Sequence, residues 1–72
     1  MKSNFDDYMI KVSKQQKKNP MLRKGQILFN EFYKIYPHEA GLITATELDP
    51  FYDDEIIDVF LVYIKKIFKE ND

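Results

Sequence analysis

Apolar residues recur at helical spacing in three segments of the chain, and the first of these runs from about residue 4 to residue 18. Its apolar side chains form a stripe roughly 100° wide, as expected of a helix lying on a core. The stripe consists of Phe5, Tyr8, Met9 and Val12. Ser3 stands where it can cap this helix, and the opposite side carries Lys11, Lys14 and Lys18.

The second segment predicts a helix that starts at Asn19-Pro20, an N-cap residue followed by Pro at the first helical position. It should end at Tyr36, because Pro37 disfavours helical geometry in the residue before it. The apolar stripe of this helix comprises Met21, Leu22, Leu28, Phe29, Phe32, Tyr33, Ile35 and Tyr36. Gly25 falls inside the stripe at a cost of about 1 kcal/mol in helix propensity, which predicts a close helix crossing there.

Between the second and third segments the periodicity is weak. Pro37 can open a short helical turn through Ala40, which Gly41 breaks, with Leu42 and Ile43 as buried residues beyond it. A turn with two large aromatics follows, at Thr46-Glu47-Leu48-Asp49-Pro50-Phe51-Tyr52.

The third segment predicts a C-terminal helix that begins after Asp53 as its cap. Its apolar residues cover roughly 200° of the helix surface, too wide an arc for a helix that covers one side of a core. They are Ile56, Ile57, Val59, Phe60, Leu61, Tyr63, Ile64, Ile67 and Phe68. Either this helix is central, or part of it contacts another chain, with Ile56, Val59 and Tyr63 exposed as the patch of a homodimer.

These elements predict an all-α fold, a single domain over residues 1–72. We expect a small bundle of three main helices plus a short helical turn, with the C-terminal helix central. The chain is 44% apolar with no cysteine, so disulfides and thiolate metal sites are excluded. No apolar run is long enough to span a membrane and residues 1–10 do not resemble a signal peptide, which favours a cytoplasmic protein.

Charge divides the chain into two parts. Residues 1–24 carry seven Lys or Arg against two Asp, and residues 25–72 carry four Lys against ten Asp or Glu. The basic part could contact nucleic acid through phosphates, which is the alternative function. We expect a solvated face instead, because carboxylates at the start of the last helix would repel DNA.

No catalytic or cofactor site is predicted. The acidic cluster at the start of the last helix comprises Asp49, Asp53, Asp54, Glu55 and Asp58, and we interpret it as caps and helix-dipole compensation rather than a metal site. His38 is the sole histidine and follows Pro37 in a turn, where a solvated side chain is expected. A nucleophile with an ordered base and a glycine-rich phosphate loop are both missing from the sequence, so we expect a protein that is not an enzyme.

A polar face on the second helix is the strongest candidate for function. Arg23, Gln26 and Asn30 point away from the apolar stripe, with Ile27 among them. We expect the turn at residues 49–53 to fold over this face as a clamp. Arg23 would then reach Asp49 or Asp53, Gln26 and Asn30 would hold the turn's backbone, and Ile27 would contact Phe51 or Tyr52. The alternative is a partner-binding surface formed by Arg23, Gln26, Ile27, Asn30, Asp49, Phe51, Tyr52 and Asp53.

The same residues carry a resemblance that covers about residues 22–61. The pattern is Arg23-x-Gly25-Gln26, Phe29-Asn30, Pro37 with Ala40, Thr46-x-x-Asp49-Pro50-Phe51-Tyr52-x-Asp54, then Ile57 and Phe60. It resembles a group of short, uncharacterised proteins of tailed phages and prophages. The resemblance implies a phage-encoded protein in a bacterial cytoplasm, and small proteins of that kind commonly bind a host protein. Together these observations predict a non-catalytic protein-binding module that binds and modulates a host or phage protein.

Overall fold

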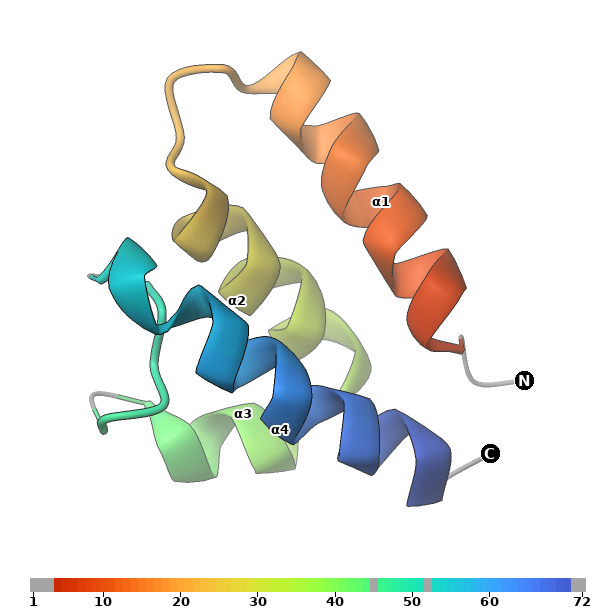
Figure 1. The fold of residues 1–72 in the computed structure, drawn as a ribbon. Helices are drawn as coiled ribbons and strands as arrows, with labels where there is room; N and C mark the ends of the chain where they lie inside the picture. The colour runs from red at the N-terminus through yellow and green to blue at the C-terminus, as the bar shows by residue number, and fades with distance from the viewer. Residues whose placement is uncertain (1–3, 45, 52, 71–72) are drawn as a thin grey trace.

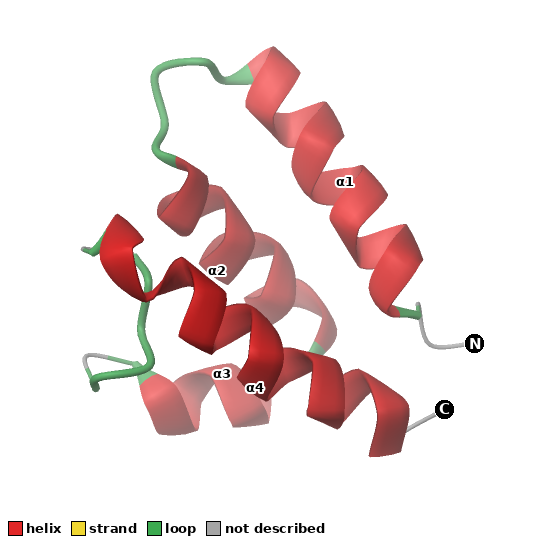
Figure 2. Cartoon of the chain, viewed as in Figure 1, coloured by secondary structure: helices red, strands yellow, loops and turns green. Residues whose placement is uncertain are grey.

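The computed structural model describes residues 4–44, 46–51 and 53–70. In chain order the elements are α1 (Phe5–Lys18), α2 (Lys24–Ile35), α3 (Pro37–Ile43), the 3₁₀ turn η1 (Asp54–Ile56) and α4 (Ile57–Glu70). Figure 2 shows these helices joined by loops, with no strand in the described part of the chain. The predicted all-α bundle of three main helices and one short one is confirmed.

The first helix has the predicted extent and a different cap. Asn4 accepts a hydrogen bond from the Asp7 amide at 2.8 Å, while Ser3 lies outside the described residues. At the other end the Asn19 amide donates to the Gln15 carbonyl at 2.8 Å, so Asn19 closes α1. The prediction that Asn19-Pro20 opens the second helix is therefore wrong: Pro20 has no amide hydrogen with which to continue α1, and it ends one helix without starting the next.

The second helix starts four residues later than predicted, at Lys24. Its cap is Arg23, whose backbone amide donates to the Gln26 side chain at 3.0 Å, so Gln26 stabilises the helix start. Tyr36 then ends α2 and precedes Pro37, the first residue of α3. The short third helix continues past Gly41 to Ile43, beyond the predicted break.

Phe32 is the centre of the hydrophobic core and is fully buried. Its ring lies 6.4 Å from Tyr8 of α1, 5.6 Å from Tyr36, and 5.7 Å from Phe60 and 6.2 Å from Phe68 of α4. Ala40 and Ile43 of α3 belong to the same core cluster. All four helices are thus joined by one largely aromatic core.

The enclosed helix is α2. It buries Gly25, Ile27, Leu28, Phe29, Glu31 and Phe32, whereas α4 buries only Phe60, Ile64 and Phe68. Figure 1 shows α2 behind α4, with α1 along one side and α3 below. The expectation that the C-terminal helix is central is wrong, because much of its wide apolar arc, including Val59 and Val62, stays on the surface.

A buried hydrogen bond ties α1 to α2. The Tyr8 hydroxyl donates to the Leu28 carbonyl at 2.6 Å. Burial, and secondly the nearby Glu31 carboxylate, raise the pKa of Tyr8 well above its ordinary value. Tyr8 therefore stays neutral and can donate to the Leu28 carbonyl, a covered acceptor that needs a donor.

Candidate functional site

The turn that follows α3 folds back over the start of α2, as the clamp hypothesis predicted. The Arg23 guanidinium donates to the Phe51 carbonyl. The Phe51 amide donates to Asp49 at 2.9 Å, and the Gly25 amide donates to Asp54 at 3.3 Å. Arg23 therefore contacts the backbone of the turn, where the sequence predicted an ion pair with Asp49 or Asp53.

Gly25 permits this close approach. An added Cβ would lie 2.1 Å from the Pro50 carbonyl oxygen and 2.8 Å from the Asp54 carboxylate. Because the nearer atom belongs to the backbone, it cannot move aside as a flexible side chain would. Gly25 does mark a close crossing, as predicted, but the crossing element is the turn rather than another helix.

The other clamp residues divide into those that the turn engages and those that it does not. Phe51 packs edge-on against Phe29, with ring centroids 6.2 Å apart. Ile27 is buried and lines the groove beside α1, and its expected contact with Phe51 or Tyr52 stays a prediction. No hydrogen bond links Asn30 to any described residue of the turn, and Tyr52 lies outside the described residues. Among the described residues, two hydrogen bonds, Arg23 to Phe51 and Gly25 to Asp54, and the Phe29–Phe51 ring contact join this part of the chain to α2. Gln26 bonds instead to the Arg23 amide.

Three carboxylates of the acidic cluster each bind a backbone amide. Asp49 binds the amide of Phe51, Asp54 binds that of Gly25, and Asp53 accepts from the Glu55 amide at 2.9 Å as the cap of η1. Within residues 4–44, 46–51 and 53–70, no group of three or more His, Asp or Glu side chains could hold a metal ion. The capping interpretation is confirmed for Asp53, which caps η1 rather than α4 itself.

The clamp makes a measurable prediction. Arg23 bonds to the carbonyl of Phe51 and Asp49 accepts from its amide. Arg23→Ala should therefore lower the free energy of unfolding by about 1 kcal/mol, and Asp49→Ala, which takes the carboxylate away from the Phe51 amide, by about 1–3 kcal/mol. The double variant should cost less than the sum, because the two side chains support one segment. Urea unfolding of the four proteins measures the coupling, and strictly additive losses would contradict a shared clamp.

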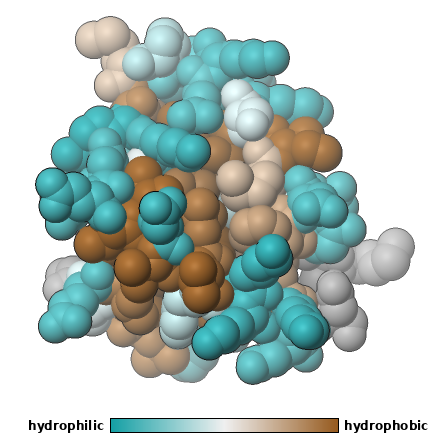
Figure 3. All heavy atoms as spheres, in the orientation of Figure 1, coloured by the Kyte–Doolittle hydropathy of each residue, from teal (hydrophilic) through white to brown (hydrophobic). Residues whose placement is uncertain are grey.

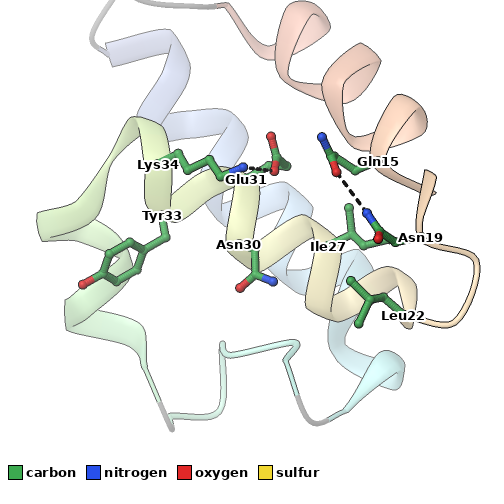
Figure 4. A pocket seen from close by; sticks show the side chains of 8 residues that line it. All are labelled: Gln15, Asn19, Leu22, Ile27, Asn30, Glu31, Tyr33 and Lys34. Carbon is green, nitrogen blue, oxygen red and sulfur yellow. Dashed lines mark hydrogen bonds and ion pairs between the residues drawn. The ribbon is translucent and has the colours of Figure 1, made fainter. Parts of the chain in front are cut away.

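A second feature is a groove of about 370 Å³ between the end of α1 and the outer side of α2. It is lined by Gln15, Asn19, Leu22, Ile27, Asn30, Glu31, Tyr33 and Lys34. Figure 4 shows the amides of Gln15 and Asn19 facing each other on the right, and the Asn30 amide between Tyr33 on the left and Leu22 on the right. The volume lies within the range of small binding pockets, roughly 300–1,000 Å³.

Polar groups in the groove are only partly used within the chain. Asn19 donates to the Gln15 oxygen at 3.2 Å, which leaves the Asn19 oxygen and the Gln15 amino group outside that bond. Lys34 and the buried Glu31 form an ion pair at 2.8 Å. Asn30 is exposed, and its side-chain amide makes no hydrogen bond to a described residue. The groove therefore offers amide donors and acceptors beside apolar side chains.

The sequence pointed to only two of the groove residues, Ile27 and Asn30. Leu22 and Tyr33 were assigned to the core stripe and are instead 42% and 50% exposed. Glu31, which was not among the candidate residues, is 7% exposed. The spacing of Glu31 and Lys34 could have indicated their pairing, because residues three apart lie on one helix face.

No arrangement in the described part of the chain resembles a catalytic centre. His38 is exposed at the start of α3, as predicted, and Ser13 is exposed on α1. None of the described helices is long and apolar enough to cross a membrane. Comparison of the chain with protein-family models, curated proteins and solved structures gave no match.

Proposed function

We propose that this chain is a non-catalytic protein-binding domain that holds an extended segment of a partner protein in the groove between α1 and α2. The observation that carries the proposal is the exposed Asn30 amide beside the exposed Leu22 and Tyr33 side chains. An amide side chain presents one donor group and one acceptor, which match the carbonyl and amide of a peptide unit. Leu22 and Tyr33 supply apolar contact area on either side.

The buried side of the groove also supports binding of an extended segment. Ile27 is packed between α1 and α2, and the Glu31–Lys34 ion pair holds the adjoining turn of α2. Six of the eight lining residues belong to α1 and α2, and Asn19 and Leu22 lie in the short loop that joins these helices. A site built mainly on packed helices favours a preformed groove that loses little entropy when a segment binds.

The resemblance to short phage and prophage proteins gives the proposal a setting. We place the protein in a bacterial cytoplasm, where it binds a host protein and modulates it. Such binding would use the Leu22–Asn30–Tyr33 surface and leave the clamp over α2 intact, because Arg23, Gln26 and Asp49 already have partners within the chain.

A displayed library of peptides tiled from bacterial proteins tests this proposal against the full-length chain. We expect enriched peptides whose affinity falls about fivefold with Asn30→Ala, the loss of about one hydrogen bond, and further with Leu22→Asp. Leu42→Asp on α3 is the matched control, since Leu42 is 64% exposed and lies outside the groove. Peptides that bind all three variants equally, or no enriched peptide, would contradict the groove as the binding site.

The exposed lysines of α1 support nucleic-acid binding as a second candidate. Lys14, Lys17 and Lys18 are all exposed on this helix. Binding through them should be independent of sequence, should weaken about tenfold or more between roughly 50 and 200 mM salt, and should be lost in Lys14→Glu. Titration of a labelled single-stranded oligonucleotide with the wild-type chain and with Asn30→Ala separates this activity from the groove, because Asn30→Ala should not affect it.

A further inference from the structure

The outer face of α4 exposes large apolar side chains that no described part of the chain covers. Val59 is 56% exposed and Val62 is 60% exposed, whereas Phe60 and Ile64 of the same helix are fully buried. Figure 3 shows apolar residues gathered over the first half of α4 and towards α3, with hydrophilic residues around them. Covering a helix face of this kind with a second apolar surface is energetically favourable.

The spacing of residues on this face is that of a helix-pairing seam. Glu55, Val59, Val62, Lys66 and Lys69 are separated by four, three, four and three positions. Alternating steps of three and four keep side chains on one line along a helix, as at the contact positions of a coiled coil. Glu55 belongs to η1, which leads directly into α4, so all five positions follow one continuous helical path.

The order of charges along the seam selects what can cover it. The acidic residue precedes the two valines, and the lysines follow them. A second copy lying antiparallel would place Val59 opposite Val62 of the second copy and Glu55 opposite Lys66 of the second copy. Two-fold symmetry repeats each contact, so the pairs formed by Glu55, Val59, Val62 and Lys66 are all apolar or oppositely charged, and Lys69 lies beyond them at the end of the seam. A parallel copy would instead set Glu55 against itself and Lys66 against itself.

Side chains beside the seam fit the same arrangement. Ile56 and Tyr63 are half-buried on one side of it, where they would meet Tyr63 and Ile56 of the second copy. On the other side, Lys65 lies over the Phe5 ring, 5.7 Å from its centroid, and is engaged with α1. The seam therefore has an apolar border on the side of Ile56 and Tyr63. Its charge pairing depends on Glu55 and Lys66.

We propose that the outer face of α4 binds a second copy of this chain in an antiparallel, two-fold-symmetric helix pair. The contact is short, since it uses one helix of 14 residues from each copy, and short interfaces belong to weak, reversible complexes. The homodimer leaves the α1–α2 groove open, because α4 lies in front of α2 in Figure 1 and behind the groove-lining face of α2 in Figure 4. Each dimer would thus present two copies of the groove.

Sedimentation of the full chain tests the pairing and its direction. We expect the mass to rise from one chain towards two between about 10 µM and about 1 mM. Val62→Asp should hold the protein as a monomer with unchanged helical circular dichroism, since Val62 is exposed. Glu55→Lys and Lys66→Glu should each weaken the dimer about tenfold, because each creates two like-charge contacts in place of two attractive ones.

The decisive sample is an equimolar mixture of Glu55→Lys and Lys66→Glu. Each variant repels itself, whereas an antiparallel pair formed from one chain of each has attractive contacts at both ends, so the mixture should dimerise again. Lys14→Glu on α1 is the charge-matched control and should associate as wild type does. A wild-type chain that stays monomeric at the highest concentration, or a mixture no tighter than its components, would overturn the proposal. Asn30→Ala should leave the dimer unchanged, so failure of the groove and failure of the dimer give separate results.

Discussion

Replacing Gly25 with alanine is expected to lower the free energy of unfolding by about 2–4 kcal/mol, although alanine is the better helix former by about 1 kcal/mol. The new methyl group would lie 2.1 Å from the Pro50 carbonyl oxygen, closer than any real contact allows. The turn must move away from α2, and the Arg23–Phe51 and Gly25–Asp54 hydrogen bonds would be strained or lost with it.

Gly41→Ala is the matched control for this prediction. Gly41 lies within α3, and an added Cβ would meet nothing within 4 Å. The same substitution should therefore raise the free energy of unfolding by about 0.5–1 kcal/mol through helix propensity. Urea unfolding of both variants measures the two effects. A stabilising Gly25→Ala would show that the turn does not lie against α2 in solution.

Phe32→Ala should have an equal or larger effect, a loss of about 3–5 kcal/mol. The ring contacts Tyr8, Tyr36, Phe60 and Phe68, so its removal opens a cavity where α1, α2 and α4 meet. A domain of 72 residues has a total stability of only about 5 kcal/mol, so the variant should be largely unfolded at room temperature.

Tyr33→Ala removes an aromatic ring at the next position of the same helix. Tyr33 is 50% exposed, and its ring lies 6.3 Å from that of Phe29 at the edge of the core, so we expect a loss below about 1 kcal/mol. Thermal unfolding followed by circular dichroism compares the two. If both variants melt at similar temperatures, Phe32 does not occupy the centre of the core.

Features that depend on neighbouring residues in the chain could be predicted from the sequence. The extent of α1, the position of Pro37 at a helix start and the capping role of Asp53 all depend on local backbone chemistry. The clamp was predictable in outline as well, because a turn with large aromatics and a polar face on α2 each need cover. Which of the clamp side chains would take part was not.

Only the tertiary structure decided how the helices share the core. Asn19-Pro20 can end one helix or start another, and the path of the chain from α1 to α2 selects the first. Ile27 and Glu31 are buried because α1 crosses that side of α2, which the periodicity of α2 alone cannot show. The groove and its Asn30 amide follow from the same crossing.

The wide apolar arc of α4 shows most clearly what helix periodicity alone cannot decide. Its sequence shows that the helix has more apolar surface than one core contact needs, and the periodicity is the same whether a second surface lies within the chain or outside it. The structure places Phe60, Ile64 and Phe68 in the core and leaves Val59 and Val62 in solvent. Helix periodicity is a local property, whereas burial depends on which other elements reach that face, and this is determined by the packing of the whole chain.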